Sequence, residues 1–388
     1  MKSRSDLTRR AFLERAGALT GALALGACSS DLEGQGTNIT TPPIPRDGGI
    51  DDNVDASPGE PVPIEEGTAA VALGHRLAAA VAVRRAVQLA GGLPEIRPGD
   101  TVFIKTNAVH GVVAGRPGIV TSNEVIAAVV RVMRDLGAGH VTVGDRPARR
   151  HDSAPVLEAT GQREAALAAG ADEVYAAPRP SEDPDAWVLL QPPGFEETWA
   201  GLGGLLAMRR IVEADHFINL PVCKNHEWAV FSLSMKNLIG AIGDDSRNPM
   251  HYVRSRPDQL SRDIAILNGA FAPRLNILDA RAALINGGPG GAGANAVRTL
   301  PGLVLASVDR LALDACGAAL LKLELGRTPI PIPDAGHPFL VDCPPWACPQ
   351  IRHGIEFGLG VDSPDKVELR FDNVADAERI EAIFRQPA

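Results

Sequence analysis

Lysine, asparagine and histidine side chains follow two apolar stretches of this sequence. The stretch TVFIKTNAVHG carries Lys105, Asn107 and His110 at its end. The stretch FINLPVCKNH ends in the same way, with Lys224 and His226. An ammonium group binds phosphate or carboxylate, and a lysine buried beside other cations loses its proton more easily and becomes a base or nucleophile. We therefore expect these two lysines and two histidines to act in catalysis on a small anionic molecule.

A further candidate lies shortly after His226, in FSLSMKNLIGAIGDDSRNPMH. Helical spacing places Met235 on a buried face with Lys236 beside it, which favours Lys236 as a fifth catalytic residue. The alternative is a lysine that lays its aliphatic stem along an apolar helix and keeps its charge in water. Substrate-binding donors, neutral or cationic, are predicted at Asn107, Asn219, Asn237 and Arg247.

A divalent metal ion is the alternative chemistry for the histidines. Imidazole and carboxylate groups suit zinc, manganese or iron. Carboxylates end two more apolar stretches, HVTVGDR and LNILDAR. The candidate ligands are scattered along the chain, so their spacing alone does not separate a metal site from isolated surface histidines. They are His110, His226, His251, Asp145 and Asp279.

Short apolar runs alternate with amphipathic helical stretches from about residue 69 onward. Strands are predicted at 70–75, 101–106, 140–145, 172–176, 216–221, 275–280, 302–307 and 366–371. Helices are predicted at 76–92, 122–139, 160–170, 233–243, 256–270 and 309–326, and residues 177–200 are expected to be irregular. This alternation predicts one large α/β domain over 68–388, a mostly parallel sheet with helices on both faces in three layers. Ligands of such sheets bind beyond the carboxyl ends of the strands, where the candidate residues lie.

The first 27 residues have the composition of an export signal. Four arginines precede the small-residue apolar run 16–27, which is too short and too glycine-rich to span a membrane. The pair Arg9 and Arg10 resembles a twin-arginine signal, and LGAC, ending at Cys28, resembles a lipoprotein box in which Cys28 receives lipid. We therefore expect the twin-arginine export machinery as a partner. The mature chain is expected on the periplasmic side of the cell envelope, anchored to a membrane through Cys28.

Residues 28–67 are rich in proline, glycine and acidic side chains and lack apolar periodicity, which predicts a disordered acidic tether. The whole chain carries a formal net charge of -9, and aromatic residues make up 4% of it. Nucleic acid is therefore not expected as a partner, because no basic stripe with interleaved aromatic residues is present. Four cysteines follow Cys28. The segment CPPWAC allows a disulfide bond between Cys343 and Cys348, and reduced thiols are the alternative.

The motifs FIKTNAVHG, GDR, DHFINLPVCKNH, SLSMKNLIGAIG and LNILDARAALINGGPGG together resemble the domain of unknown function number 362 family, across about residues 70–360. Family members are often joined to iron-sulfur modules, but this chain has no Cys-x-x-Cys run, so no cluster is implied. The sequence GPGGAG does not predict an NAD site, because it leads toward another strand and not into a helix. The resemblance implies a fold and a site, but no reaction.

These observations predict an enzyme of unknown reaction that acts on a small anionic molecule, either a phosphate or a carboxylate. A metal ion that assists the reaction is an open alternative. A solute-binding lipoprotein without catalysis is the first alternative, because a lipid anchor and a tether suit a receptor equally well. A metal-dependent redox protein is the second. The cofactor and the oligomeric state are not specified by the sequence.

Overall fold

A computed structural model describes residues 62–66, 68–75, 78–93, 95–111, 116–252, 257–291, 296–334 and 337–387. The predicted signal peptide, Cys28 and most of the predicted tether lie outside the described residues. His251, inside a helix, is described by its backbone alone. Residues 62–66, which the sequence assigns to the tether, are held at the folded region, where Arg370 donates hydrogen bonds to the carbonyls of Val62 and Pro63.

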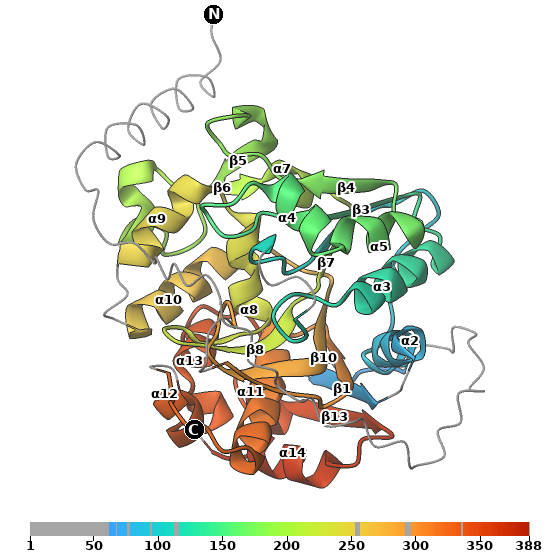
Figure 1. Cartoon of the computed structure of the whole chain (residues 1–388), viewed down its shortest axis with the longest axis vertical. Helices are drawn as coiled ribbons and strands as arrows, with labels where there is room; N and C mark the ends of the chain where they lie inside the picture. Colours follow the sequence, from blue (N-terminus) through green and yellow to red (C-terminus); the bar gives the residue numbers. More distant parts are fainter. Residues whose placement is uncertain are drawn as a thin grey trace, which may run out of the picture. The chain divides into compact units, whose positions relative to one another are not determined.

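A mixed, mostly parallel sheet forms the centre of this α/β fold (Figure 1). Its order is β13 (Val367–Asp372), β1 (Ala69–His75), β12 (Leu303–Ser307), β10 (Leu275–Asn286), β7 (His216–Asn219), β2 (Thr101–Lys105), β3 (His140–Asp145) and β4 (Glu173–Ala176). Strand β8 (Val222–His226) runs parallel to β10 and pairs antiparallel with β9 (Val230–Ser232), while β11 (Val297–Thr299) pairs with β10. Only β12 breaks the parallel direction within the main order, because it runs antiparallel to β1 and β10. The predicted fold class is confirmed.

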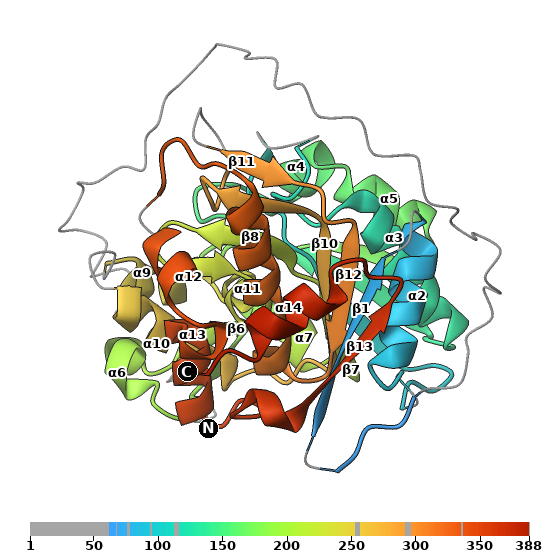
Figure 2. The same cartoon turned by 90° about the horizontal axis from the view of Figure 1, so that it is seen from below.

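Apolar side chains alternate between the two faces of the central strands, so each face carries its own core. In β12, Val304 belongs to one core and Leu303 and Leu305 to the other. Helices α2 (Ala79–Leu89) and α3 (Asn123–Asp135) cover the first face, and α11 (Arg310–Arg327), α13 (Pro349–Glu356) and α14 (Ala377–Phe384) cover the second. In Figure 2, α2 lies on one side of β1 and β12, and α11 and α14 lie on the other. The sheet is thus the middle of three layers.

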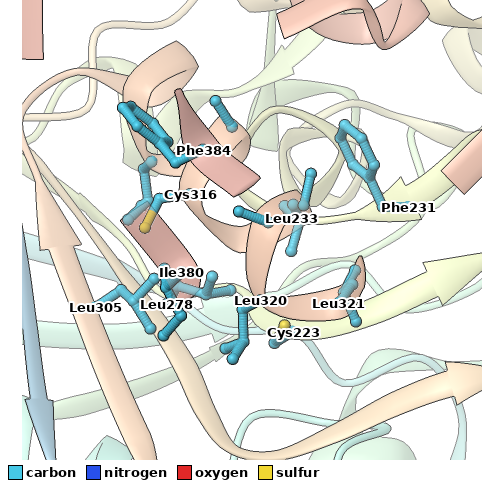
Figure 3. Close-up of a cluster of buried hydrophobic side chains, with 14 of the residues drawn as sticks. Cys223, Phe231, Leu233, Leu278, Leu305, Cys316, Leu320, Leu321, Ile380 and Phe384 are labelled. Carbon is cyan, nitrogen blue, oxygen red and sulfur yellow. The ribbon is translucent and has the colours of Figure 1, made fainter. Parts of the chain in front are cut away.

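The core on the α11 face joins strands and helices that are far apart in the sequence. Figure 3 shows Leu278 and Leu305 of the sheet beside Leu320 of α11 and Ile380 of α14. Cys223 of β8 belongs to the same core, so β8 is fixed by buried apolar contacts although three of its five residues are polar. This packing fixes the strand that carries Lys224.

The remaining helices among the described residues have four to twelve residues. They are α4 (Ser153–Ala159), α5 (Gln162–Ala168), α6 (Glu196–Trp199), α7 (Arg209–Val212), α8 (Ser234–Asn237), α9 (Asp244–Tyr252), α10 (Pro257–Asn268) and α12 (His337–Asp342), with single 3-10 turns at 184–186, 200–202, 238–241, 345–347 and 364–366. Among the described residues no helix has the length and apolar character needed to cross a membrane.

Two local predictions are wrong. Residues 177–200 are not irregular throughout, because β5 (Trp187–Leu190) pairs antiparallel with β6 (Leu205–Met208) in a separate two-stranded sheet. The helix predicted over 233–243 is interrupted, since α8 begins only at Ser234, has four residues and is followed by a 3-10 turn. Both segments take their conformation from tertiary contacts: Trp187 is 2% exposed, and Ser234 contacts a buried carboxylate of α11.

Candidate functional site

A row of polar residues crosses the sheet at the ends of its central strands. Lys105 of β2 stands in register with Asn219 of β7, which is in register with Asn276 of β10, and Asn276 is in register with Ser307 of β12. Partners in register point to the same face of a sheet. The side chain of Asn219 donates to Asn276 at 2.9 Å, and that of Asn237 donates to Asn219 at 2.8 Å. The row therefore continues from the sheet into α8.

The ammonium group of Lys105 is enclosed by three oxygen atoms. It donates to Asp145 Oδ1 at 2.7 Å, to the Thr106 carbonyl at 2.8 Å and to Asn237 Oδ1 at 3.4 Å. An ammonium group has three N–H donors, so none is left for a ligand. Burial lowers the pKa of Lys105, and the neighbouring Asp145 carboxylate opposes that shift. Lys105 is therefore a fixed cation, paired with Asp145.

The glycine at position 240 lets the backbone pack directly against this ion pair. A Cβ atom at Gly240 would clash with the carboxylate of Asp145 and the ammonium of Lys105. The Gly240 carbonyl also accepts from the backbone N–H of Arg146 at 3.2 Å. Any larger residue at 240 would displace one of the two charged groups.

Lys224 is enclosed in the same way, from the other side of Asn107. It donates to Asn107 Oδ1 at 3.1 Å, to the Ile119 carbonyl at 2.7 Å and to the Pro289 carbonyl at 3.3 Å. All three acceptors are uncharged, and the side chain is 1% exposed. Burial, and then the positive charge of Lys236, lowers the pKa of Lys224 well below its ordinary value.

Asn107 and Asn237 link the two enclosed lysines. The amide of Asn107 donates to Asn237 Oδ1 at 3.0 Å, and the same oxygen accepts from Lys105. A continuous hydrogen-bonded path thus runs from Lys224 through both asparagines to Lys105. We call Lys105, Lys224 and Lys236, with Asn107 and Asn237, the lysine site.

Lys236 lies beside this path and differs from the other two lysines. In the described parts of the chain it makes no hydrogen bond and no ion pair. Its side chain is partly buried. Burial lowers the pKa of Lys236 to about 7, with further contributions from the positive charges of Arg247 and Lys105. Lys236 is the member of the lysine site whose nitrogen is free to contact a ligand.

The short helix that carries Lys236 and Asn237 is held by a buried carboxylate that the sequence analysis missed. Asp314 of α11 accepts from the backbone N–H and the hydroxyl of Ser234, both at 2.6 Å, and from the N–H of Met235 at 3.0 Å. Burial raises the pKa of Asp314 to about 6, although these hydrogen bonds act in the opposite direction. A single acidic residue inside the apolar stretch LALDACGAAL was the available signal.

Gln162 is a second residue that sequence reasoning missed. Its amide nitrogen donates to the carbonyls of Asn107 at 3.0 Å and Thr121 at 3.2 Å, and its oxygen accepts from the Thr106 hydroxyl at 2.8 Å. Gln162 is fully buried at the start of α5. It fixes the loop that carries Asn107, and its sequence context, an Ala-rich helix, gave no sign of this role.

Arg247, predicted to bind substrate, is buried and occupied by backbone carbonyls. It donates to Ile242 at 2.9 Å, to Pro147 at 2.5 Å and to Arg146 at 2.8 Å. Burial lowers the pKa of Arg247 to about 10. Its positive charge acts on Lys236. Arg247 therefore contributes a fixed positive charge beside the lysine site, while its donors hold the loop after β3.

The two predicted catalytic histidines lie in different surroundings. His226 Nδ1 accepts from the backbone N–H groups of Trp228 at 3.1 Å and Ala229 at 3.2 Å, so that nitrogen stabilises the turn between β8 and β9. His110 is partly buried, stacks on His151 with ring centroids 5.5 Å apart, and has a buried Nδ1 with no hydrogen-bond partner. Burial lowers the pKa of His110, with smaller contributions from His151 and Lys224. His110 is therefore the histidine at the edge of the lysine site.

The backbone next to His110 is strained. Val109 has a φ of 50°, in the left-handed region that a β-branched residue rarely adopts. Its carbonyl accepts from the N–H of Ala148 at 2.8 Å, which ties it to the loop after β3. Backbone strain of this kind is concentrated at functional sites, where surrounding contacts compensate for it.

The predicted metal ligands do not gather in the described structure. Asp145 is paired with Lys105, while Asp279 accepts from the N–H groups of Ser122 at 2.7 Å and Arg281 at 3.1 Å, which holds the start of α3. Burial raises the pKa of Asp279. No group of three or more His, Cys, Asp or Glu residues in the described parts could hold a metal ion. Cys223, Cys316, Cys343 and Cys348 are free thiols.

The family model described as domain of unknown function (DUF362) matches residues 102–319, which are more than half of the 388 residues. This chain belongs to the DUF362 family. The match contains the three lysines of the lysine site and Asp314. A thylakoid-associated protein of Synechocystis sp. is 27% identical to this DUF362 protein over 305 residues, which cover 71% of the chain and 85% of that relative.

Two solved structures are similar to part of this DUF362 chain. The lactate racemase apoprotein of Thermoanaerobacterium thermosaccharolyticum is 14% identical with a TM-score of 0.37, and the match covers 61% of this chain and 54% of that one. A protein of Thermotoga maritima is 12% identical with a TM-score of 0.34, over 47% of each chain. The chain thus spans about half the length of each of these structures.

Proposed function

We propose that this DUF362 protein is an exported, lipid-anchored enzyme that binds a small phosphate or carboxylate at the lysine site. The single observation that supports it most strongly is that the Lys236 nitrogen has no partner among the described residues and lies beside further basic groups. Lys105, Lys224, Lys236 and Arg247 place four basic groups there, against the one carboxylate of Asp145. A surplus of partly desolvated positive charge favours an anion as ligand.

The proposal assigns different tasks to the lysines. Lys236 contacts the anion, since it has donors to spare. Lys105 and Lys224 supply a fixed electrostatic field, because their own donors are satisfied within the protein. Asn107 and Asn237 orient both lysines, and His110, at the edge of the site with its unpartnered Nδ1, is the candidate for proton transfer.

Calorimetric titration of the full-length chain with phosphorylated and carboxylated metabolites tests the binding part. A hydrogen bond to a charged group contributes about 1.5–3 kcal/mol, so Lys236→Met should weaken binding by roughly tenfold or more. The matched control is Lys366→Met, since Lys366 is exposed and pairs with Asp362 at the surface. Equal affinities for both variants and the wild type would contradict the proposal.

Turnover separates an enzyme from a solute receptor. After a ligand is found, its conversion is followed by NMR in the presence of wild-type protein and the His110→Asn variant. An enzyme consumes the ligand and slows markedly without His110, while a receptor binds the ligand and leaves it unchanged. Metal analysis of protein folded in the cytoplasm accompanies this assay, because twin-arginine export allows a metal to be loaded before export.

The proposed localisation depends on Arg9, Arg10 and Cys28. Cell fractionation of the wild type should give membrane-bound protein on the periplasmic side. Cys28→Ser should release the chain from the membrane, and replacement of both arginines by lysine should keep it in the cytoplasm. Membrane attachment that survives Cys28→Ser would contradict the lipid anchor and leave the binding proposal unaffected.

A further inference from the structure

The chain uses lysine rarely, yet concentrates it at the lysine site. Its lysines are Lys2, Lys105, Lys224, Lys236, Lys322 and Lys366, so 32 of the 38 Lys and Arg residues are arginine. Half of the six lysines meet at one place. The fold also buries arginine, as at Arg146 and at Arg247 beside the lysine site, which are 1% and 3% exposed. Lysine at this site therefore reflects a property that arginine lacks.

Two properties distinguish the side chain of lysine from that of arginine. The ammonium group is compact, and lysine can lose its proton near neutral pH, whereas the guanidinium group stays protonated. Compactness accounts for Lys105 and Lys224, whose three donors fit three converging oxygens each. It does not account for Lys236, which has no such acceptors in the described structure. For Lys236 the remaining property is the loss of a proton.

The surroundings of Lys236 favour its neutral form. Burial and the charges of Arg247 and Lys105 bring the pKa of Lys236 to about 7, so the unprotonated amine is populated at neutral pH. No carboxylate pairs with Lys236 in the described residues to restore the charged form. A neutral amine with an unshared electron pair is a nucleophile toward carbonyl carbon.

We propose that Lys236 Nζ forms an imine with the carbonyl carbon of a small anionic aldehyde or ketone, whose carboxylate or phosphate lies in the field of Lys105 and Lys224. This inference rests on the proposed function and names its substrate class. The amine nitrogen attacks the carbonyl carbon, and the carbonyl oxygen takes up a proton, which gives a carbinolamine. The hydroxyl then leaves with a proton as water while the C=N bond forms. No oxidant or reductant is consumed.

The charges around the site favour imine formation at two places on the substrate. The positive charges of Lys105 and Lys224 offset the anionic end of the substrate and the negative charge that develops on the carbonyl oxygen. Lys105 and Lys224 keep their positions during the reaction, because Asp145 and Asn107 hold them. Lys236 alone changes its bonding.

Reductive trapping tests the proposal on the full-length chain in detergent. The protein is incubated with pyruvate, 2-oxoglutarate or dihydroxyacetone phosphate, reduced with sodium borohydride, and analysed by intact mass and peptide mapping. We expect one stable adduct, located on Lys236, with a trapping rate that rises with pH through about 7. The carboxylate and phosphate probes identify which anionic group is accepted.

Lys236→Arg is the decisive variant, since it keeps the positive charge and cannot form an imine. We expect it to abolish trapping, a loss of at least 100-fold, while calorimetry still detects probe binding. Lys366→Arg, the control, should be trapped at the wild-type rate on Lys236. Adducts spread over the other lysines, or the same adduct yield in Lys236→Arg, would overturn the proposal.

The two experiments distinguish a failure of anion binding from a failure of imine formation. A probe that binds in a Lys236-dependent manner without any adduct would overturn the imine and leave the anion-binding function in place. A wild-type protein that neither binds nor traps any of the three probes would overturn both.

Discussion

Lys105 and Lys224, carried by strands, are each enclosed by three oxygen acceptors, whereas Lys236, carried by a four-residue helix, has none in the described structure. All three are desolvated, and burial lowers the pKa of each. The comparison shows that burial alone does not define a reactive lysine. Acceptors on every side make a buried lysine a structural cation, and their absence leaves its nitrogen available for chemistry.

The largest effect is expected for Lys105→Met, which removes the cation that pairs with buried Asp145. An uncompensated buried charge costs about 3–5 kcal/mol of unfolding free energy. Urea denaturation measures this loss. The control Lys366→Met removes an exposed ion pair and should change the unfolding free energy by less than about 1 kcal/mol. A Lys105→Met protein as stable as its control would show that Lys105 is not held as described.

Asp314→Asn tests how the free lysine is positioned. Asparagine offers one oxygen where the carboxylate offers two, so at least one donor of Ser234 or Met235 loses its acceptor. We expect a loss of about 2 kcal/mol of unfolding free energy, because hydrogen bonds to charged groups contribute about 1.5–3 kcal/mol each. The exposed Asp365→Asn should be neutral. Weaker ligand binding in Asp314→Asn than in Asp365→Asn would connect α11 to the site.

Gly240→Ala introduces a methyl group against the Lys105–Asp145 pair. Overpacking of this kind typically costs about 1–3 kcal/mol. The matched control is Gly326→Ala near the end of α11, where an added Cβ meets no atom within 4 Å. That change should be neutral or stabilise the protein by up to about 1 kcal/mol, since alanine favours helix more than glycine does. Equal stabilities of both variants would contradict the close contact.

The smallest effect is expected for Lys236→Met, and it depends on pH. The folded pKa of about 7 lies below the ordinary 10.5, so the unfolded chain binds more protons between these values and wild-type stability rises with pH across that window. Between pH ~7 and ~8 this contribution amounts to about 1 kcal/mol. Lys236→Met should lack it and be at least as stable as the wild type at neutral pH. Urea denaturation at several pH values measures this difference. The same change of unfolding free energy with pH in the wild type and in Lys236→Met would contradict the lowered pKa.

The sheet could be predicted from the sequence because its strands alternate with amphipathic helices in separate, continuous stretches. The ends of β2, β3 and β7 were predicted to within one or two residues. The sheet then brings Lys105 and Asn219 together, since parallel neighbours in register share one edge. The convergence of strand-end residues follows from this topology.

The other half of the site could not be predicted from local sequence. VCKNH forms β8, although three of its five residues are polar and buried, because β10 and β9 supply its partners. The short α8 depends on Asp314, about 80 residues away in the chain. Sequence periodicity reports the burial of apolar residues, but it does not report which distant carbonyl or carboxylate satisfies a polar one.

Selective labelling of lysine with carbon-13 at the ε position tests the central claim most directly, because the chain has six lysines and the spectrum is simple. A pH titration followed by NMR gives the pKa of each ammonium group in the full-length protein. The account predicts that the Lys236 resonance, identified by its disappearance in Lys236→Arg, titrates near pH 7. A Lys236 resonance that titrates near the ordinary 10.5 would contradict the distinction between the held lysines and the free one.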